Sequence, residues 1–211
     1  MSKFNNPKQV ILASQSPRRV ALLKQMGFDC LVMPADIDET ALANESPADY
    51  VLRLAVQKAL AALKKLNGQQ AHLPILAADT TVALGVEIFG KPENDIDAFN
   101  MLKKLSGSTH EVHTAIALAF KGKLETRLNT TLVQMMPLTD AMIEAYIATG
   151  EHKDKAGSYA IQGMAGNWIT RIEGSYTGVM GLPVHETAML LDKILVDKIS
   201  TDKISTDKIL R

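Results

Sequence analysis

The serines and arginines between positions 14 and 19 have the types and the spacing that bind phosphate. Ser16 suits a helix cap, since its hydroxyl can accept from a free backbone N–H, and Pro17 suits the first helical position. Arg18 and Arg19 then fall in the first turn, where the helix dipole disfavours each exposed cation by about 0.3–1 kcal/mol. A bound phosphate reverses that effect, because two guanidiniums and the hydroxyls of Ser14 and Ser16 converge on it. The stretch predicts a phosphate-binding turn, and a surface turn with two solvated arginines is the alternative.

Carboxylates further along the chain have the chemistry to hold a metal ion or to activate water. Asp36, Asp38 and Glu39 place three carboxylates in four residues, and hard divalent cations prefer oxygen ligands. A solvated loop is the alternative. Asp79 directly follows an apolar run, residues 74–78, that predicts a central strand. Ligands of α/β sheets sit beyond the carboxyl ends of strands, so Asp79 is well placed for chemistry; a carboxylate that only starts a turn is the alternative.

Two lysines and two histidines are further candidates. Lys58 falls within the apolar stripe of a helix expected at residues 46–67, which opens with a Ser-Pro-Ala-Asp capping box. Its ammonium therefore points inward or toward a cleft, unless only the stem packs on apolar surface while the ammonium reaches water. Lys91 lies in a rigid Gly-Lys-Pro turn. His110 and His113 lie three residues apart in an extended segment, where an odd offset puts side chains on opposite faces, so a shared zinc site is disfavoured.

Length and charge exclude several classes of protein. The chain has 211 residues, enough for one domain or two closely joined lobes. Lys plus Arg and Asp plus Glu number 23 each, so no overall field would attract a nucleic-acid polymer or an anionic membrane. Cys30 is the only cysteine and excludes an intrachain disulfide, and no apolar run approaches the roughly 20 residues that span a bilayer. We expect a cytoplasmic, soluble enzyme whose anion site is local.

Strands and helices that alternate along the chain predict an α/β fold that positions these residues. The remaining expected elements are strands at 10–13 and 28–33, a helix at 16–27, a helix capped by Asp95 that runs to 105, a hairpin of 112–120 and 124–135, a helix at 139–150, a strand at 154–163 and a helix after 181. In the expected strand, Gln162 has an amide that can donate and accept at once, which suits reading the edge of a base. The Asp-Lys-Ile-Ser-Thr repeats near the end trace no single helical face, so residues 196–211 are expected to form an exposed tail after a domain at 1–195.

Two common nucleotide motifs are absent. The chain has neither G-x-x-x-x-G-K-[ST] nor G-x-G-x-x-G, so a P-loop kinase or a dinucleotide-binding site is unsupported. What remains is an Arg-Arg turn, two lysines, one aspartate after a strand and an acidic loop. These are the parts of a metal-assisted phosphate-ester site, in which cations hold the polyphosphate and a carboxylate activates water.

An ordered set of motifs makes the chain resemble the Maf family of nucleoside triphosphate pyrophosphatases. The motifs are Leu-Ala-Ser-x-Ser-Pro-Arg-Arg at 12–19, Ala-Ala-Asp-Thr at 77–80, Gly-Lys-Pro at 90–92, Leu-Ser-Gly-x-x-His at 105–110, Asp-Lys-Ala-Gly-x-Tyr-x-Ile-Gln-Gly at 154–163 and Gly-Leu-Pro at 181–183. The resemblance implies a mixed twisted sheet flanked by helices, with two lobes and a cleft, as in inosine triphosphatases. It also implies hydrolysis of dTTP, UTP and modified pyrimidine analogues to the monophosphate and pyrophosphate, with Mg²⁺ or Mn²⁺, often by a homodimer.

The resemblance also implies roles for particular residues. Asp79 matches the general base, and Glu39 matches an acidic residue linked to the metal site, a role that Asp79 can share. The positions that match the phosphate-binding set are Ser14, Arg18, Arg19, Lys58 and Lys91. Arg18, Thr80 and Gln162 match positions that mark the subgroup acting on dTTP and UTP. Gly178 departs from the family pattern, since many members carry Asn there.

Two other functions remain open at this point. The family is also associated with inhibition of septum formation, so a nucleotide-binding regulator of cell division is one alternative. A phosphatase that releases orthophosphate is the other. The ratio of pyrophosphate to orthophosphate released by the purified chain separates these possibilities.

Overall fold

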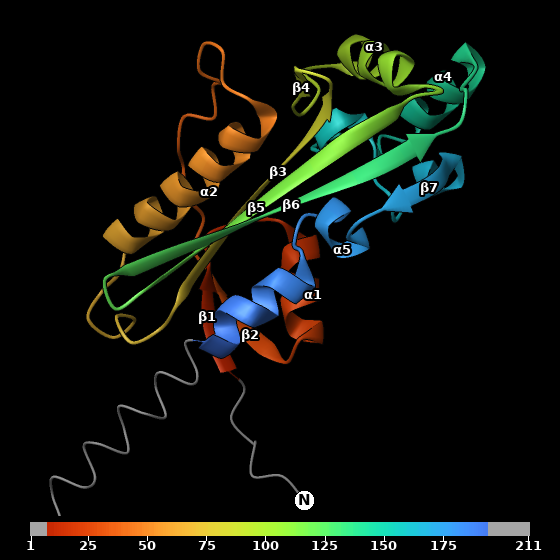
Figure 1. Cartoon of the computed structure of the whole chain (residues 1–211). Coiled ribbons are helices and arrows are strands. Elements are labelled where there is room, and N and C mark those ends of the chain that lie inside the picture. The colour runs from red at the N-terminus through yellow and green to blue at the C-terminus, as the bar shows by residue number, and fades with distance from the viewer. Residues whose placement is uncertain (1–7, 194–211) are drawn as a thin grey trace, which may run out of the picture.

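A mixed seven-stranded sheet forms the centre of the computed structural model, which describes residues 8–193 (Figure 1). The strands are β1 (Lys8–Leu12), β2 (Phe28–Val32), β3 (Ile75–Leu84), β4 (Glu87–Phe89), β5 (Thr109–Phe120), β6 (Lys123–Met135) and β7 (Ile169–Glu173). Their order is β2-β1-β3-β5-β6-β7, with β4 beside β3. β1 runs parallel to β2 and β3, and the other pairs are antiparallel. The expected mixed sheet is confirmed.

Helices cover both faces of the sheet at its β1 end. Helix α2 (Pro47–Lys64) packs on one face, and α1 (Pro17–Gln25) and a helical segment at residues 184–193 pack on the other (Figure 1). The alternation of β5 explains this division: Ala115 and Ala117 belong to the core beneath α2, and Ile116 and Leu118 to the core beneath α1. The expected layers of helix, sheet and helix are therefore present.

A second core region lies at the other end of the long strands. It gathers around α3 (Asp95–Leu105), α4 (Asp140–Ala148) and the short 3-10 helices η1 (Ala156–Ser158) and η2 (Met164–Trp168). β3 joins the two regions, since Leu76 packs in the core beneath α1 and Val82 in the second core. Helix α5 (Tyr176–Val179) then leads the chain back toward α1.

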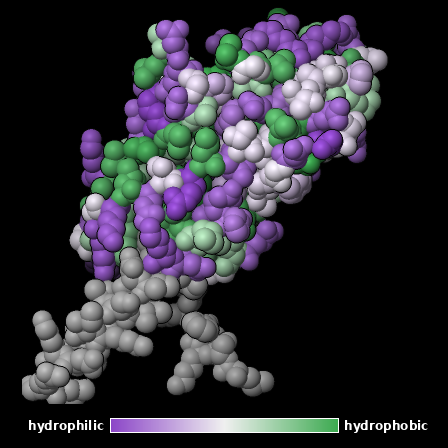
Figure 2. Space-filling view, in the orientation of Figure 1, coloured by the Kyte–Doolittle hydropathy of each residue, from purple (hydrophilic) through white to green (hydrophobic). Residues whose placement is uncertain are grey.

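The outer surface mixes residue types. Hydrophilic residues lie among hydrophobic ones over the face drawn in Figure 2. Within residues 8–193, no helix is both long enough and apolar enough to cross a membrane.

The strand expected at residues 154–163 was a wrong prediction. This segment forms η1 and turns, because Asp154, Gly157 and Ser158 all have left-handed backbones, with φ of 58°, 66° and 64°. Gly157 also lies so close to Val82 that a Cβ there would sit 2.9 Å from a valine methyl. A contact with β3, rather than local sequence, therefore decides the conformation of the segment.

Smaller corrections concern element boundaries. Asn94, not Asp95, caps α3, because its side chain accepts the Asp97 N–H. Helix α2 ends at Lys64, three residues before the expected end. Asp79 lies inside β3, not at its end. The expected tail at residues 196–211 lies outside the described residues.

Candidate active site

A cavity of about 900 Å³ opens beside β3, where one edge of this strand is unpaired within residues 8–193. β3 pairs with β1 at residues 75–76 and with β4 at residues 82–84, so its edge between them is unpaired. All nine residues that the family resemblance assigns to the site line this cavity: Ser14, Arg18, Arg19, Glu39, Lys58, Asp79, Thr80, Lys91 and Gln162. The volume lies in the range of small-molecule sites. Asp79 was expected at the carboxyl end of its own strand; instead it lies beyond the carboxyl end of β1.

Arg19 is held in place by neutral oxygens only. Its Nε donates to the Gly181 carbonyl at 2.7 Å, Nη1 to Ser14 Oγ at 2.9 Å, and Nη2 to Thr80 Oγ1 at 3.2 Å. Burial lowers the pKa of the guanidinium, against the opposing charge of Asp79. Within residues 8–193, no carboxylate forms an ion pair with Arg19 at 4 Å or less. Its position is fixed, and its charge remains available for an anion.

The neighbouring helix start differs from expectation in one respect. Ser16 is the N-cap residue of α1, as predicted, but its hydroxyl makes no capping hydrogen bond. Instead the Ser16 N–H donates to Ser14 Oγ at 3.2 Å. Arg18 Nε donates to the Met180 carbonyl at 3.3 Å, and burial lowers the pKa of Arg18. The first turn of α1 therefore faces the cavity with two arginines and no side-chain cap.

Lys58 bridges two carboxylates at the opposite end of the cavity. Its Nζ lies 2.5 Å from Asp79 Oδ1 and 2.7 Å from Glu39 Oε1. The inward direction expected for Lys58 is confirmed, since the residue is 9% exposed. Burial raises the pKa of Asp79, with Lys58 and then Arg19 opposing it. Burial also favours a higher pKa for Glu39, but the hydrogen bond from Lys58 and its charge outweigh it and lower the pKa.

The alternation of β3 places its two adjacent site residues on different walls of the cavity. Asp79 contacts Lys58 of α2, and Thr80 contacts Arg19 of α1. Thr80 Oγ1 also shares a hydrogen bond of 2.9 Å with Thr114 Oγ1. Both Asp79 and Thr80 reach the cavity because, within residues 8–193, the edge of β3 opposite β5 has no paired strand at this point. This meeting of opposite faces depends on strand register and is not visible in the sequence.

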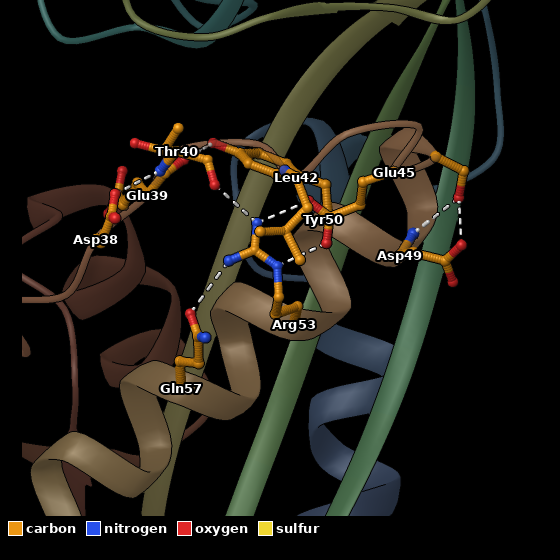
Figure 3. Close-up of polar contacts among 10 residues, drawn as sticks. Asp38, Glu39, Thr40, Leu42, Glu45, Asp49, Tyr50, Arg53 and Gln57 are labelled. Atoms are coloured by element: carbon orange, nitrogen blue, oxygen red, sulfur yellow. Dashed lines mark hydrogen bonds and ion pairs between the residues drawn. The ribbon is translucent and has the colours of Figure 1, made fainter.

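An arginine clasp holds the loop that carries Glu39 (Figure 3). Arg53 donates through Nε and Nη2 to the Glu45 carboxylate at 2.6 and 2.7 Å, and through Nη2 to the Thr40 carbonyl at 3.0 Å. Tyr50 Oη donates to the Glu39 carbonyl at 2.9 Å. These contacts tie the loop to α2. Sequence reasoning missed Arg53 and Tyr50, because only their position on a helix beside an acidic loop distinguishes them.

The expected acidic triad does not form a metal cluster. The carboxylate of Asp38 accepts the Thr40 N–H at 2.9 Å, and the Thr40 side chain, followed by this N–H, lowers the pKa of Asp38. Asp36 and Glu39 line the cavity. Over residues 8–193, no group of three or more His, Cys, Asp or Glu side chains is arranged to hold a metal ion. A metal held here would need additional ligands from water or substrate.

The cavity wall formed by residues 154–162 contributes Gln162 and a cation that sequence reasoning missed. Lys155 lines the cavity, and burial, followed by the charge of Arg18, lowers its pKa. It lies in the Asp-Lys-Ala-Gly motif, which was the available signal. Tyr159 lines the same wall and shares a hydrogen bond of 2.7 Å with His110 Nε2. Burial lowers the pKa of His110 to about 4, so this histidine is neutral near pH 7.

The two histidines that could suggest zinc do not meet. His110 bonds Tyr159, whereas His113 Nδ1 shares a hydrogen bond of 2.9 Å with Thr130. Gly178, the departure from the family pattern, also has a structural reason. A Cβ at Gly178 would lie 2.6 Å from Asn129 Oδ1, so a larger residue would displace Asn129.

This chain matches one protein family and is similar to several proteins named as pyrophosphatases. Residues 9–194 match the Maf family, described as Maf-like protein. A dTTP/UTP pyrophosphatase of Methylobacillus flagellatus is 52% identical over 186 residues, which cover 88% of this chain and 92% of that protein. A dTTP/UTP pyrophosphatase of Pasteurella multocida is 48% identical, over 87% and 94%. A nucleoside triphosphate pyrophosphatase of Haemophilus ducreyi is 47% identical, over 89% and 95%.

Among solved structures, the Staphylococcus aureus Ham1 protein aligns with a TM-score of 0.42 and 16% identity, over 61% of this chain and 72% of that chain. The sequence matches are far more extensive. Since they cover most of the chain and reach 52% identity, the chain belongs to the Maf family, as the motifs predicted.

Proposed function

We propose that this protein hydrolyses nucleoside triphosphates, dTTP and UTP in particular, to the monophosphate and pyrophosphate. One observation carries the proposal: a cavity joins arginines that have no carboxylate partner among residues 8–193 to a buried, lysine-bound aspartate. The relatives named dTTP/UTP pyrophosphatase support the substrate class. The same chemistry suits modified pyrimidine triphosphates.

The arginines bind the polyphosphate in this proposal. Arg18 and Arg19 project from the uncapped first turn of α1, where backbone N–H groups and the helix dipole also favour an anion. Ser14, Thr80 and the Gly181 carbonyl preset the Arg19 guanidinium. A preset donor loses little freedom on binding, so its electrostatic effect on the transition state is larger. Lys91, exposed at the rim, adds a further cation.

Asp79 acts on the attacking water. The water oxygen attacks the α-phosphorus, its proton passes to the Asp79 carboxylate, and the bond from the α-phosphorus to the bridging oxygen breaks, so that pyrophosphate leaves. Burial makes Asp79 a stronger base than a solvated aspartate, because it raises the pKa of the carboxyl. Lys58 keeps the carboxylate ionised and oriented at 2.5 Å. Phosphoryl transfer of this kind depends mainly on position and charge.

The donor set at Glu39 and Asp79 fits a divalent cation shared with the substrate. These carboxylates already converge on one cation, the Lys58 ammonium, at 2.7 and 2.5 Å. Mg²⁺ is commonly bound by one or two carboxylates together with substrate phosphates and water. Glu39 and Asp79 would therefore hold Mg²⁺ or Mn²⁺ with the triphosphate. When bound, the metal would neutralise phosphate charge and polarise the phosphoryl oxygens.

We assign specificity for the base to the cavity wall formed by residues 154–162, which carries Gln162. Gln162 is exposed on the cavity lining, and its amide can donate to and accept from the edge of a pyrimidine. Thr80 contributes indirectly, because its hydroxyl holds Arg19 and pairs with Thr114. Arg18, in the first turn of α1, contacts the phosphates.

Product analysis tests the proposal. The purified chain is incubated with dTTP, UTP, a modified pyrimidine triphosphate, ATP and GTP in Mg²⁺ or Mn²⁺, and pyrophosphate and orthophosphate are measured separately. We expect one pyrophosphate and one nucleoside monophosphate per turnover, fastest with the pyrimidines. Release of orthophosphate would instead indicate a phosphatase. Tight binding with neither product would indicate the regulatory alternative.

A further inference from the structure

The turn that carries Gln162 is anchored by residues outside the cavity. The Gly163 N–H donates to the Ala160 carbonyl at 3.1 Å, which closes a tight turn with Gln162 exposed at its corner. Gln162 itself makes no side-chain hydrogen bond within the described part of the chain, so the backbone of the turn sets where its amide points. Whatever holds residues 160–164 therefore sets the position of this amide.

Glu151 holds one end of that turn and is itself bound by Tyr146. Its Oε2 accepts the Met164 N–H at 3.1 Å, just after Gln162, where η2 begins. Its Oε1 accepts the Tyr146 hydroxyl at 3.3 Å. This carboxylate and phenol, the Glu151–Tyr146 bracket, hold the turn just after Gln162.

The anchor behind this bracket is rigid. Tyr146 is fully buried, and its ring meets the edge of Trp168 at a centroid distance of 5.0 Å and an angle of 67°. It belongs to the second core region, which is built on α3 and α4. Glu151 and Tyr146 therefore connect the packed second core region to the turn that carries Gln162 on the cavity wall.

Gly163 shows how closely Glu151 fits the turn. Its φ of −105° and ψ of −155° are open to any residue, so the backbone does not require glycine here. A Cβ at this position would lie 1.8 Å from Glu151 Oε1 and 2.6 Å from Oε2. A side chain at this position would therefore have to displace the Glu151 carboxylate. Glu151 and Gly163 thus form one interlocking unit.

We infer that Glu151 is a positioning residue that sets base selectivity by fixing Gln162, an inference that rests on the proposed function. Glu151 does not line the cavity, so it acts through the turn and not on the nucleotide. Loss of its carboxylate releases the Met164 N–H and the Tyr146 hydroxyl together. The Gln162 amide then samples several positions, and a pyrimidine loses its advantage over a purine.

A set of four variants tests this inference: Glu151→Ala, Glu151→Gln, Gly163→Ala and the double variant Glu151→Ala/Gly163→Ala. Pyrophosphate release from dTTP and GTP gives kcat and KM for each. We expect Glu151→Ala to reduce the dTTP preference about tenfold, mainly through KM for dTTP, as expected for a lost binding contact of this size. Glu151→Gln retains an oxygen acceptor and should keep most of the preference.

The double variant provides the sharpest readout. Gly163→Ala alone collides with the carboxylate and should reduce the preference as Glu151→Ala does. Once the carboxylate is gone the collision is gone, so adding Gly163→Ala to Glu151→Ala should change little; this non-additivity marks direct coupling. Glu144→Ala, an exposed glutamate of α4, is the matched control and should resemble the parent.

Distinct outcomes overturn distinct claims. If the parent releases no pyrophosphate from any nucleotide, the proposed function fails. If the parent is active and selective but Glu151→Ala only lowers the melting temperature and keeps the dTTP preference, Glu151 is structural and the inference fails alone. A parent that is active without preferring pyrimidines also overturns the inference while leaving the hydrolysis intact. Strictly additive effects of the two substitutions would contradict the interlock.

Discussion

The two ends of the cavity contain cations that are satisfied in opposite ways. At one end, Lys58 is neutralised by Asp79 and Glu39, at 2.5 and 2.7 Å. At the other, Arg19 donates to a carbonyl and two hydroxyls, and none of these carries a counter-charge. The first end forms a complete ion cluster without a ligand. The second is held in place but keeps its charge.

This difference suits the arginine end to substrate binding and the Lys58 end to the chemical reaction. Burying a charge without a partner is costly, and burial lowers the pKa of Arg19 accordingly. Neutral acceptors offset part of that cost and also aim the guanidinium. A polyanion supplies the missing counter-charge, so the arginine end gains most from substrate. The Lys58 end gains less from binding and instead prepares a carboxylate for reaction.

The largest effect on activity should come from a substitution at the Lys58 end of the cavity, which contains Asp79. Asp79→Asn keeps the shape of the side chain and an oxygen that accepts from Lys58, but it removes the base. We expect kcat to fall by about 10³-fold, in the range for loss of a general base, with nucleotide affinity nearly unchanged. Single-turnover kinetics and equilibrium binding of dTTP measure the two separately, with Asp29→Asn on exposed β2 as control. Parent-like turnover would remove Asp79 from the mechanism.

A substitution at the arginine end should instead weaken nucleotide binding. Arg19→Lys retains the charge but cannot reach Ser14, Thr80 and Gly181 together, because a lysine lacks the planar fork. We expect kcat/KM for dTTP to fall about 100-fold, as for loss of one preset donor, with weaker nucleotide binding. Arg127→Lys, exposed on β6, is the control. An unchanged affinity would show that the two ends are not divided as described.

The sequence alone predicted the features that helix capping and helical periodicity determine. The capping box at Ser46, where the hydroxyl accepts the Asp49 N–H at 3.1 Å, and the inward direction of Lys58 follow from helix chemistry and periodicity. Most site residues lie in motifs, whereas Lys58 was identified from its place on a helix and Glu39 from an acidic loop. How they meet was not visible, because the unpaired edge of β3 arises from the registers of β1 and β4.

Tertiary contacts decide the parts that were missed. The left-handed backbones of Asp154 and Ser158 depend on packing of the intervening Gly157 against Val82, which overrides the extended pattern of the segment. The bond between Arg53 and Glu45 spans eight residues from a loop to a helix, an offset that no periodicity predicts. Both features position site residues, and neither conformation follows from the local sequence pattern.

The arginine clasp should affect metal use more than nucleotide binding. Arg53→Met frees the loop that carries Glu39, so we expect the Mn²⁺ concentration for half-maximal activity to rise about tenfold, as for loss of an outer support of a ligand. Calorimetric titration of Mn²⁺ into the protein with a non-hydrolysable nucleotide should show the same shift. Arg171→Met, exposed on β7, is the control. If nucleotide affinity without metal changes equally, the clasp serves the whole cavity.

The smallest effects should appear in stability, with opposite dependences on pH. Arg53 lowers the pKa of Glu45 from 4.5 to about 2, so the unfolded chain binds this proton more tightly, and the stabilisation is lost as pH falls from 4.5 toward 2. Melting of Glu45→Gln should therefore lie below the parent near pH 7 and approach it in acid.

The contribution of Asp79 to stability should depend on pH in the opposite direction to that of Glu45. Burial raises its pKa above the usual 3.8, so the folded chain binds the proton more tightly and stability is lost as pH rises through the raised value. Asp79→Asn should then melt above the parent near pH 8, and the difference should vanish as pH falls below about 3.8, the usual aspartate pKa. Melting curves from pH 3 to 8 measure both variants. A variant that melts below the parent at pH 8 would mean that Lys58 compensates fully for the burial of Asp79.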